Sequence, residues 1–256
     1  MYNRISDSST RATQTDELSQ PGDNDSFTET LANLAMQRSL PPDKMGCCVS
    51  TPRASDPDNP SASSAARPST SLFEYRTAEL ADANVDGICV GLTGEWLNNL
   101  GSSPRSRMNA LIPGSERHRA AAERQQQYED LRAELRRDGA ESSQANMQAK
   151  NTVLREMGLE PSGREKEYNF DPASSLRMQG KITADGSNHL LSLRFAEGGR
   201  HTIATSASDG RTTLFDPNYG EFSVRPDQMD RLFQSLDNRY RNPNGLHIST
   251  ITTQKM

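Results

Sequence analysis

Residues 190–224 read LLSLRFAEGGRHTIATSASDGRTTLFDPNYGEFSV, and this stretch decides the fold class. It contains four short runs rich in apolar and β-branched residues, separated by turns that contain glycine. Such runs predict successive antiparallel strands. Asp209-Gly210, between two of the runs, is a strong signal for a two-residue hairpin turn. The predicted strands are LLSLRF (190–195), RHTIATS (200–206), RTTLFD (211–216) and EFSV (221–224).

The register of this hairpin brings a histidine and an aspartate to one face of the sheet. A two-residue turn pairs Ser208 with Arg211, which makes His201 and Asp216 diagonal neighbours. Diagonal neighbours lie about 7–8 Å apart, within reach of long side chains. The aspartate can then accept the Nδ1–H of the histidine, fix its tautomer and stabilise the imidazolium. The alternative is a partly exposed strand histidine beside an ordinary turn aspartate.

Helices are predicted on both sides of this strand region. Because the helices come mostly first and the strands later, we predict an α+β domain. The helix over 113–137 carries opposite charges at spacings of three and four, which is typical of a solvated face. An insertion that shapes a substrate cleft is the other interpretation. The predicted helices cover 86–100, 113–137, 142–157 and 227–240, and HISTITT (247–253) alternates like a further strand.

Cys89 lies in the run DGICVGL at the predicted start of the first helix. Asp86 is a good N-cap residue, so Cys89 is expected in the first helical turn. The positive end of the helix dipole favours a thiolate there, and a thiolate is a competent nucleophile. The alternative interpretation is a small buried core residue.

Composition divides the chain in two. Only 32% of the 256 residues are hydrophobic and the mean hydropathy is −0.82, too polar for packing from end to end. Seven of the 14 prolines lie before residue 71, so we predict a disordered N-terminal arm over 1–71 and a globular domain over 72–256. The net charge of −5 argues against a nucleic-acid binder. Three cysteines and four scattered histidines predict neither a disulfide framework nor a structural zinc site, and no apolar run is long enough to span a bilayer.

The arm contains a lipidation pattern within PPDKMGCCVS (41–50). Gly46 fits the N-myristoylation pattern, and Cys47 and Cys48 are candidates for palmitoylation. One myristoyl chain binds membranes marginally, so two signals together predict stable anchoring. Gly46 is internal, however, and its amine must be exposed by a cut after Met45 or by a translation start at Met45. A chance match within the arm is the alternative.

Three motifs resemble the YopT/AvrPphB family of type III effector cysteine proteases, including its rhizobial members. They are NVDGICVGL (84–92), GGRHTIA (198–204) and TTLFDPNYGEF (212–222), and the likeness covers roughly 72–256. The resemblance implies a papain-like α+β fold without a metal or organic cofactor. It implies Cys89 as nucleophile, His201 as general base and Asp216 as the residue that orients it. Asn84 and the Cys89 backbone N–H would form the oxyanion hole.

The same resemblance also implies how the protein is secreted, processed and localised. Members are secreted by a type III system into a host cell, and several cut themselves near an Asp-Lys pair. Here Met45 stands between the Asp43-Lys44 pair and Gly46. A cut after Lys44 would leave Met45 in front of Gly46, whereas a cut after Met45 exposes Gly46 directly, so we predict cleavage between Met45 and Gly46. Host acyltransferases would then add myristate to Gly46 and palmitate to Cys47 or Cys48. The protease would cleave host signalling proteins, kinases among them, at the inner face of the host plasma membrane.

A second hypothesis belongs to a different class of protein. The chain could be a non-enzymatic, lipid-anchored adaptor whose Gly46 is exposed by an internal start or by a foreign protease. In that case Cys89 is a core residue and the charged helix over 113–137 is the interaction surface. A Cys89 variant separates the two, because only the enzyme needs the thiol.

Overall fold

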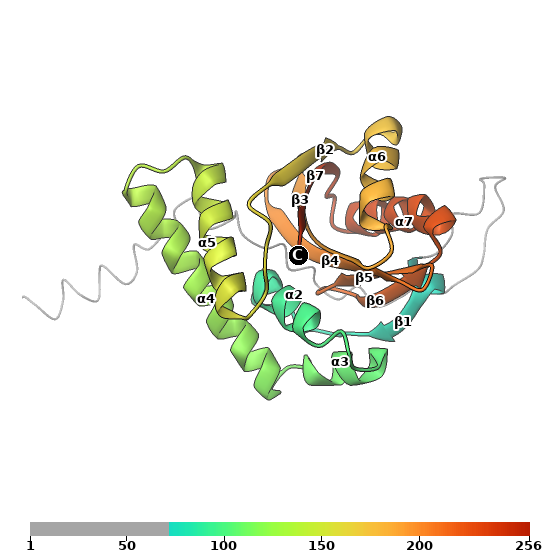
Figure 1. Ribbon diagram of the computed structural model, residues 1–256, viewed down its shortest axis with the longest axis horizontal. Coiled ribbons are helices and arrows are strands. Elements are labelled where there is room, and N and C mark those ends of the chain that lie inside the picture. Colours follow the sequence, from blue (N-terminus) through green and yellow to red (C-terminus); the bar gives the residue numbers. More distant parts are fainter. Residues whose placement is uncertain (1–71) are drawn as a thin grey trace, which may run out of the picture. The chain divides into compact units, whose positions relative to one another are not determined.

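The computed structural model describes residues 72–256, which form an α+β domain, as the sequence predicted (Figure 1). The predicted arm lies outside the described residues, and so do the residues of the predicted cleavage and lipidation sites, Asp43, Lys44, Met45, Gly46, Cys47 and Cys48. One seven-stranded antiparallel sheet has the order β1-β6-β5-β4-β3-β7-β2. Its strands are β1 (Arg76–Glu79), β2 (Glu165–Asn169), β3 (Ser187–Phe195), β4 (Arg200–Ser208), β5 (Arg211–Asp216), β6 (Gly220–Val224) and β7 (Ile248–Lys255). The helices are α2 (Cys89–Asn98), α3 (Pro104–Ala110), α4 (Glu116–Arg137), α5 (Ser142–Glu156), α6 (Pro172–Ile182) and α7 (Met229–Arg241), with short 3-10 turns η2 (Leu72–Tyr75) and η3 (Pro226–Gln228).

The hairpin between β4 and β5 has the predicted register. Ser208 pairs with Arg211 across the turn. Asp209 and Gly210 have φ values of 54° and 68°, the left-handed conformation that a type I′ turn requires at both central positions. The four strands predicted from 190–224 are all present, as is the later strand β7. Two strands were missed, β1 and β2, because RTAE and EKEYN are polar and lack the apolar alternation that marks a strand.

Helices cover both faces of the sheet. Residues of α6 and α7 share one hydrophobic cluster with alternate sheet residues, and residues of α2 and α3 share another with the remaining ones. In Figure 1 these two helix pairs lie on opposite sides of the strands. Strand β3 illustrates how the sheet is buried on both faces: Leu191 and Leu193 belong to the first cluster, and Leu190 belongs to the second. A strand buried on both faces needs apolar residues in both alternate sets.

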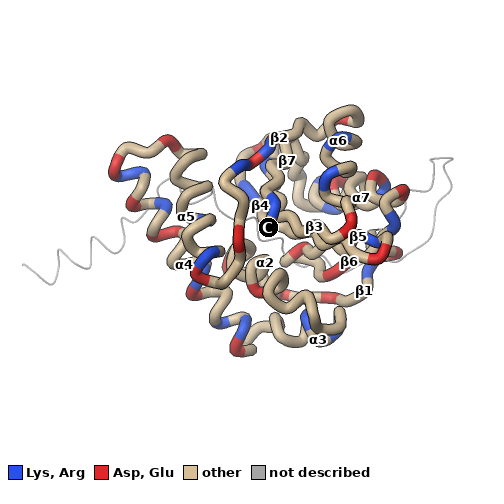
Figure 2. Tube along the Cα trace, in the orientation of Figure 1, with Lys and Arg blue, Asp and Glu red and all other residues tan. Residues whose placement is uncertain are grey.

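The two longest helices, α4 and α5, pack against each other and project from the sheet (Figure 1). Charges of both signs follow one another along α4 (Figure 2), as a solvated face requires. One narrow stripe of α4 is nevertheless buried, made of Ala121, Gln125 and Tyr128. The predicted exposed helix is therefore confirmed for its outer face, while its inner face packs on α2. None of the helices within residues 72–256 is long and apolar enough to cross a membrane.

The crossing of α2 and α4 depends on Gly91. A Cβ atom at this position would lie 1.9 Å from the backbone carbonyl oxygen of Ala121 on α4. Real Cβ atoms do not approach backbone atoms so closely, so any larger residue has to push the two helices apart. Because Cys89 is two residues before this contact, the crossing also fixes the start of the helix that carries it.

We expect Gly91→Ala to lower the free energy of unfolding by about 2 kcal/mol or more, a large overpacking cost. Urea denaturation followed by circular dichroism measures it. Gly180→Ala is the matched control, since Gly180 lies within α6 and its added Cβ would meet nothing within 4 Å. There alanine should be neutral or stabilising, because alanine favours the helix. Equal stability of the two variants would contradict a tight α2–α4 crossing.

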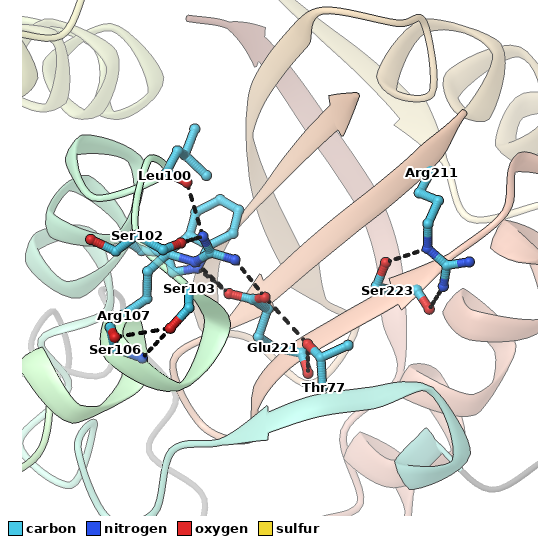
Figure 3. A network of polar contacts seen from close by, with 10 residues as sticks. Thr77, Leu100, Ser102, Ser103, Ser106, Arg107, Arg211, Glu221 and Ser223 are labelled. Carbon is cyan, nitrogen blue, oxygen red and sulfur yellow. Dashed lines mark hydrogen bonds and ion pairs between the residues drawn. The ribbon is translucent and has the colours of Figure 1, made fainter. Parts of the chain in front are cut away.

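A buried ion pair between Arg107 and Glu221 joins α3 to β6 (Figure 3). The Arg107 guanidinium donates from Nε and Nη2 to the two carboxylate oxygens of Glu221, at 2.8 and 2.7 Å. The Trp96 indole N–H donates to Glu221 Oε2 at 2.9 Å, and the Thr77 hydroxyl donates to Oε1 at 3.2 Å. Arg107 also donates to the backbone carbonyls of Leu100 and Ser102. Each carboxylate oxygen thus has two donors, which a buried charge requires.

Candidate active site

His201 and Asp216 form a hydrogen-bonded pair at the α7 side of the sheet. Both side chains are completely buried. His201 Nε2 lies 2.9 Å from Asp216 Oδ1, so the predicted juxtaposition of these residues is confirmed. The predicted ring nitrogen is wrong, since the carboxylate meets Nε2 and not Nδ1. Strand register decides which residues are neighbours, whereas the side-chain torsions within the core decide which edge of the ring faces the acid.

This arrangement leaves Nδ1 of His201 for other chemistry. Among the described residues, the buried Nδ1 atom has no hydrogen-bond partner. With a carboxylate accepting the proton of Nε2, the neutral ring carries its lone pair on Nδ1. A lone pair held in a fixed direction is what a general base needs.

The Asp216 carboxylate receives two further hydrogen bonds. The backbone N–H of Asn218 donates to Oδ1 at 2.9 Å, and the Tyr240 hydroxyl donates to Oδ2 at 2.8 Å. Burial, and next the negative charge of Asp216, raise the pKa of Tyr240 well above its ordinary value. The tyrosine is therefore a neutral donor at any working pH. Sequence reasoning placed Tyr240 on a helix but gave it no role, because only the packing of α7 brings it to the aspartate.

Cys89 is the first residue of α2 and is completely buried. The prediction of Asp86 as N-cap is wrong, because the cap position is Ile88 and no local side chain caps the helix. A turn closed by the Gly87 N–H on the Asn84 carbonyl, at 3.1 Å, delays the start of the helix. The first-turn placement of Cys89 is nevertheless confirmed. The predicted helix end at residue 100 is also late, since the helix ends at Asn98 and its C-cap is Asn99.

The missing cap of α2 comes from a distant helix. Gln125 of α4 accepts a hydrogen bond from the Val90 backbone N–H at its side-chain oxygen, at 3.0 Å. Cys89 itself packs in a small cluster with Tyr128 of α4 and Val153 of α5.

Two contacts join α2 and the loop before it to residues that neighbour His201 and Asp216 in the chain. The Thr93 hydroxyl, one helical turn after Cys89, donates to the carbonyl of Thr202 at 3.2 Å. Thr202 is the residue after His201 on β4. Asn84 is buried, and its Nδ2 donates to Asn218 Oδ1 at 2.7 Å. The loop before Cys89 therefore meets the turn that follows Asp216.

A polar cavity of about 180 Å³ lies between α5 and the sheet. Glu165, one of the lining residues, forms a partly buried ion pair with Lys150, whose Nζ lies 2.7 Å from Glu165 Oε1. Burial lowers the pKa of Lys150, although the Glu165 carboxylate opposes this. Arg200, the residue before His201, also lines the cavity, so the cavity approaches the candidate site. The lining residues are Ser143, Asn146, Glu165, Glu167, Ser192, Leu193, Arg194, Arg200 and Thr252.

The remaining histidines make different contacts. His118 Nε2 lies 2.9 Å from the Ala83 carbonyl oxygen, and His247 pairs with Glu197 at the surface. His189 is buried, and desolvation lowers its pKa. Within residues 72–256, no three His, Cys, Asp or Glu side chains are grouped as metal ligands would be. His201 is thus the one described histidine joined to a buried carboxylate.

Comparison with known proteins shows which family of sequences this chain matches. The family model Peptidase_C58, described as Yersinia/Haemophilus virulence surface antigen, matches residues 67–256. Two proteins named as YopT-like cysteine proteases align over the full length of both chains. One, from Bradyrhizobium diazoefficiens, is 63% identical, and the other, from Sinorhizobium fredii, is 61% identical.

A solved structure agrees with the predicted fold. The crystal structure of the Pseudomonas avirulence protein AvrPphB matches 73% of this chain and all of its own, with a TM-score of 0.65 and 30% identity. By sequence, the cysteine protease AvrPphB of Pseudomonas savastanoi pv. phaseolicola is 32% identical over 68% of this chain and 66% of its own. The predicted papain-like α+β fold is thereby confirmed.

Proposed function

Because this chain belongs to the Peptidase_C58 family of YopT/AvrPphB-like cysteine protease effectors, we propose that Cys89, His201 and Asp216 are its catalytic triad. The observation that carries this proposal is the completely buried His201–Asp216 hydrogen bond of 2.9 Å. Within the described residues it leaves Nδ1 without a partner. Cys89 supports it by opening a helix that packs on the strand of His201.

The proposed reaction is acyl transfer through a thioester. His201 Nδ1 takes the proton of the reduced Cys89 thiol, and the sulfur attacks the carbonyl carbon of the scissile peptide bond. The resulting imidazolium is stabilised by Asp216 and gives its proton to the leaving amine as the C–N bond breaks. Water, activated by the same nitrogen, then hydrolyses the thioester and restores the thiol. No metal or organic cofactor takes part.

We assign Asn84 and the Cys89 backbone N–H to the oxyanion hole. The observation that supports Asn84 is its burial in the loop directly before Cys89. Its Nδ2 carries two protons, and one of them is directed at Asn218. A donor aimed at the developing oxyanion typically contributes about 10²–10³ to the rate.

The proposed biology follows from the predicted scissile bond. The protease cuts its own chain between Met45 and Gly46, with Asp43 and Lys44 preceding the bond, and exposes Gly46 as a new N-terminus. Inside a host cell, after type III secretion, host acyltransferases would modify Gly46 and Cys47 or Cys48. The enzyme would then cleave host signalling proteins, with kinases among them, at the inner face of the plasma membrane.

The test is intact-mass spectrometry of purified full-length protein, kept in a thiol reductant. We expect wild-type protein to begin at Gly46, 45 residues shorter than its translated length, while Cys89→Ala keeps residues 1–45. The mutant removes only a sulfur atom, so its melting temperature should stay close to that of the wild type.

Cleavage of the Cys89→Ala protein at the same bond would overturn the proposal, as would wild-type protein that stays full length. Either result would favour the lipid-anchored adaptor, for which Cys89 is only a core residue. A cut at another bond that still needs Cys89 would keep the enzyme and correct the scissile bond.

A further inference from the structure

Tyr240 contacts both members of the His201–Asp216 pair. It is completely buried in α7. Its hydroxyl donates to Asp216 Oδ2 at 2.8 Å, the oxygen that does not meet the histidine. Its ring centroid lies 5.7 Å from that of His201, with a tilt of 57° between the planes. One side chain thus holds the acid by a hydrogen bond and the base by ring packing.

A continuous series of hydrogen bonds runs through this hydroxyl. Asn84 Nδ2 donates to Asn218 Oδ1 at 2.7 Å, and Asn218 Nδ2 donates to the Tyr240 oxygen at 3.1 Å. Tyr240 in turn donates to Asp216. Hydrogen bonds in such a series polarise one another, so each step strengthens the next. The series begins in the loop before Cys89 and ends at the carboxylate that holds His201.

We propose that Tyr240 is a positioning residue of this peptidase, which fixes the Asp216 carboxylate so that His201 presents Nδ1 in the reactive direction. Asn218 is its partner, orienting the hydroxyl and tying the Asn84 loop to the same point. The inference rests on the proposed function, because it assigns Tyr240 a part in orienting the proposed general base.

The chemistry suits a phenol better than a charged donor. A lysine or arginine beside Asp216 would compete with the imidazolium for the negative charge of the carboxylate, whereas a neutral hydroxyl does not. The hydroxyl still satisfies an oxygen that would otherwise be buried without a partner, at high cost. Rings of Phe195 and Tyr219, at 5.1 and 5.6 Å between centroids, hold the Tyr240 ring in turn.

The first experiment measures kcat and KM of Tyr240→Phe on a peptide that copies residues 38–53, with thiol reductant present. Phenylalanine keeps the ring packing and removes only the donor. We expect kcat to fall about 10- to 100-fold, the effect of losing one hydrogen bond to a charged group. KM should stay unchanged, because Tyr240 lies behind Asp216 and touches no substrate.

Tyr168→Phe is the matched control. Tyr168 is a buried tyrosine of the same hydrophobic cluster, on β2, and is not bonded to the pair. Tyr168→Phe removes a hydroxyl that does not contact the pair, so kcat should stay at the wild-type value. Melting temperatures of both variants show that the comparison is between folded proteins. Should Tyr240→Phe fail to fold, Asn218→Ala serves instead, since it removes the partner that orients the hydroxyl, and a several-fold fall in kcat is expected.

The second experiment asks whether Tyr240 acts through Asp216. In an Asp216→Asn background, Tyr240→Phe should cause almost no further loss, because the oriented carboxylate is already absent. An equal fold-loss in both backgrounds would mean that Tyr240 acts by another route and would overturn the inference. So would a wild-type kcat for Tyr240→Phe alone.

Failure of the inference is distinguishable from failure of the proposed function. If the peptide is cut by wild-type protein but not by Cys89→Ala, the peptidase stands and the tyrosine result decides the inference alone. If Cys89→Ala cuts as well, or wild-type protein does not cut, the proposed function falls and the role of Tyr240 falls with it.

Discussion

Asp216→Asn is expected to lower kcat by about 10²–10⁴-fold, the range associated with a histidine held in the wrong tautomer. Asparagine matches aspartate in shape but can present an N–H to His201 Nε2. That nitrogen would then accept a hydrogen bond, and its proton would move to Nδ1, where the thiol proton has to go. Steady-state kinetics on the peptide copying residues 38–53 measures the effect.

The control for Asp216→Asn is Asp227→Asn. Asp227 is exposed and pairs with Arg225 at 3.1 Å on the surface. Exposed pairs contribute little, so this variant should keep both its activity and its melting temperature. Turnover near the wild-type level in Asp216→Asn, with the thiol still required, would remove Asp216 from the mechanism.

Glu221→Gln is expected to lower the free energy of unfolding by about 3 kcal/mol or more. The change leaves the buried Arg107 guanidinium without its counter-charge (Figure 3). Only 9% of the Arg107 side chain and 1% of the Glu221 side chain are exposed, so water cannot replace the lost partner. Urea unfolding followed by Trp96 fluorescence, the signal of the one tryptophan in the chain, reports the change.

A double variant tests the cause of that loss. Arg107→Met combined with Glu221→Gln removes both charges, and it should be more stable than Glu221→Gln alone, because no unpaired buried charge remains. The exposed pair of Arg225 and Asp227 supplies the contrast, since its removal should leave stability almost unchanged. A Glu221→Gln protein as stable as wild type would show that the buried pair does not hold α3 to the sheet.

Local sequence patterns predicted the central strands of this fold, although the composition of the whole chain is polar. The turn at Asp209-Gly210 fixed the register of β4 and β5, because two residues of positive φ allow a single pairing. That register alone was enough to bring His201 to Asp216. The edge strands β1 and β2 and the helices α3 and α6 were missed, because their polar or short sequences carry weak local signals.

Only the tertiary structure decided the contacts between elements that lie far apart in the chain. The cap of α2 comes from Gln125, 35 residues away, and not from Asp86 beside it. Asp216 meets Nε2 of His201 because side-chain torsions in the packed core, and not strand register, set the ring. Tyr240 reaches Asp216 because α7 folds back onto the sheet. Local pattern thus determined the central strands β3 to β6, the strand β7 and the pairing of β4 with β5, whereas the orientation of the candidate site depends on packing that no periodicity encodes.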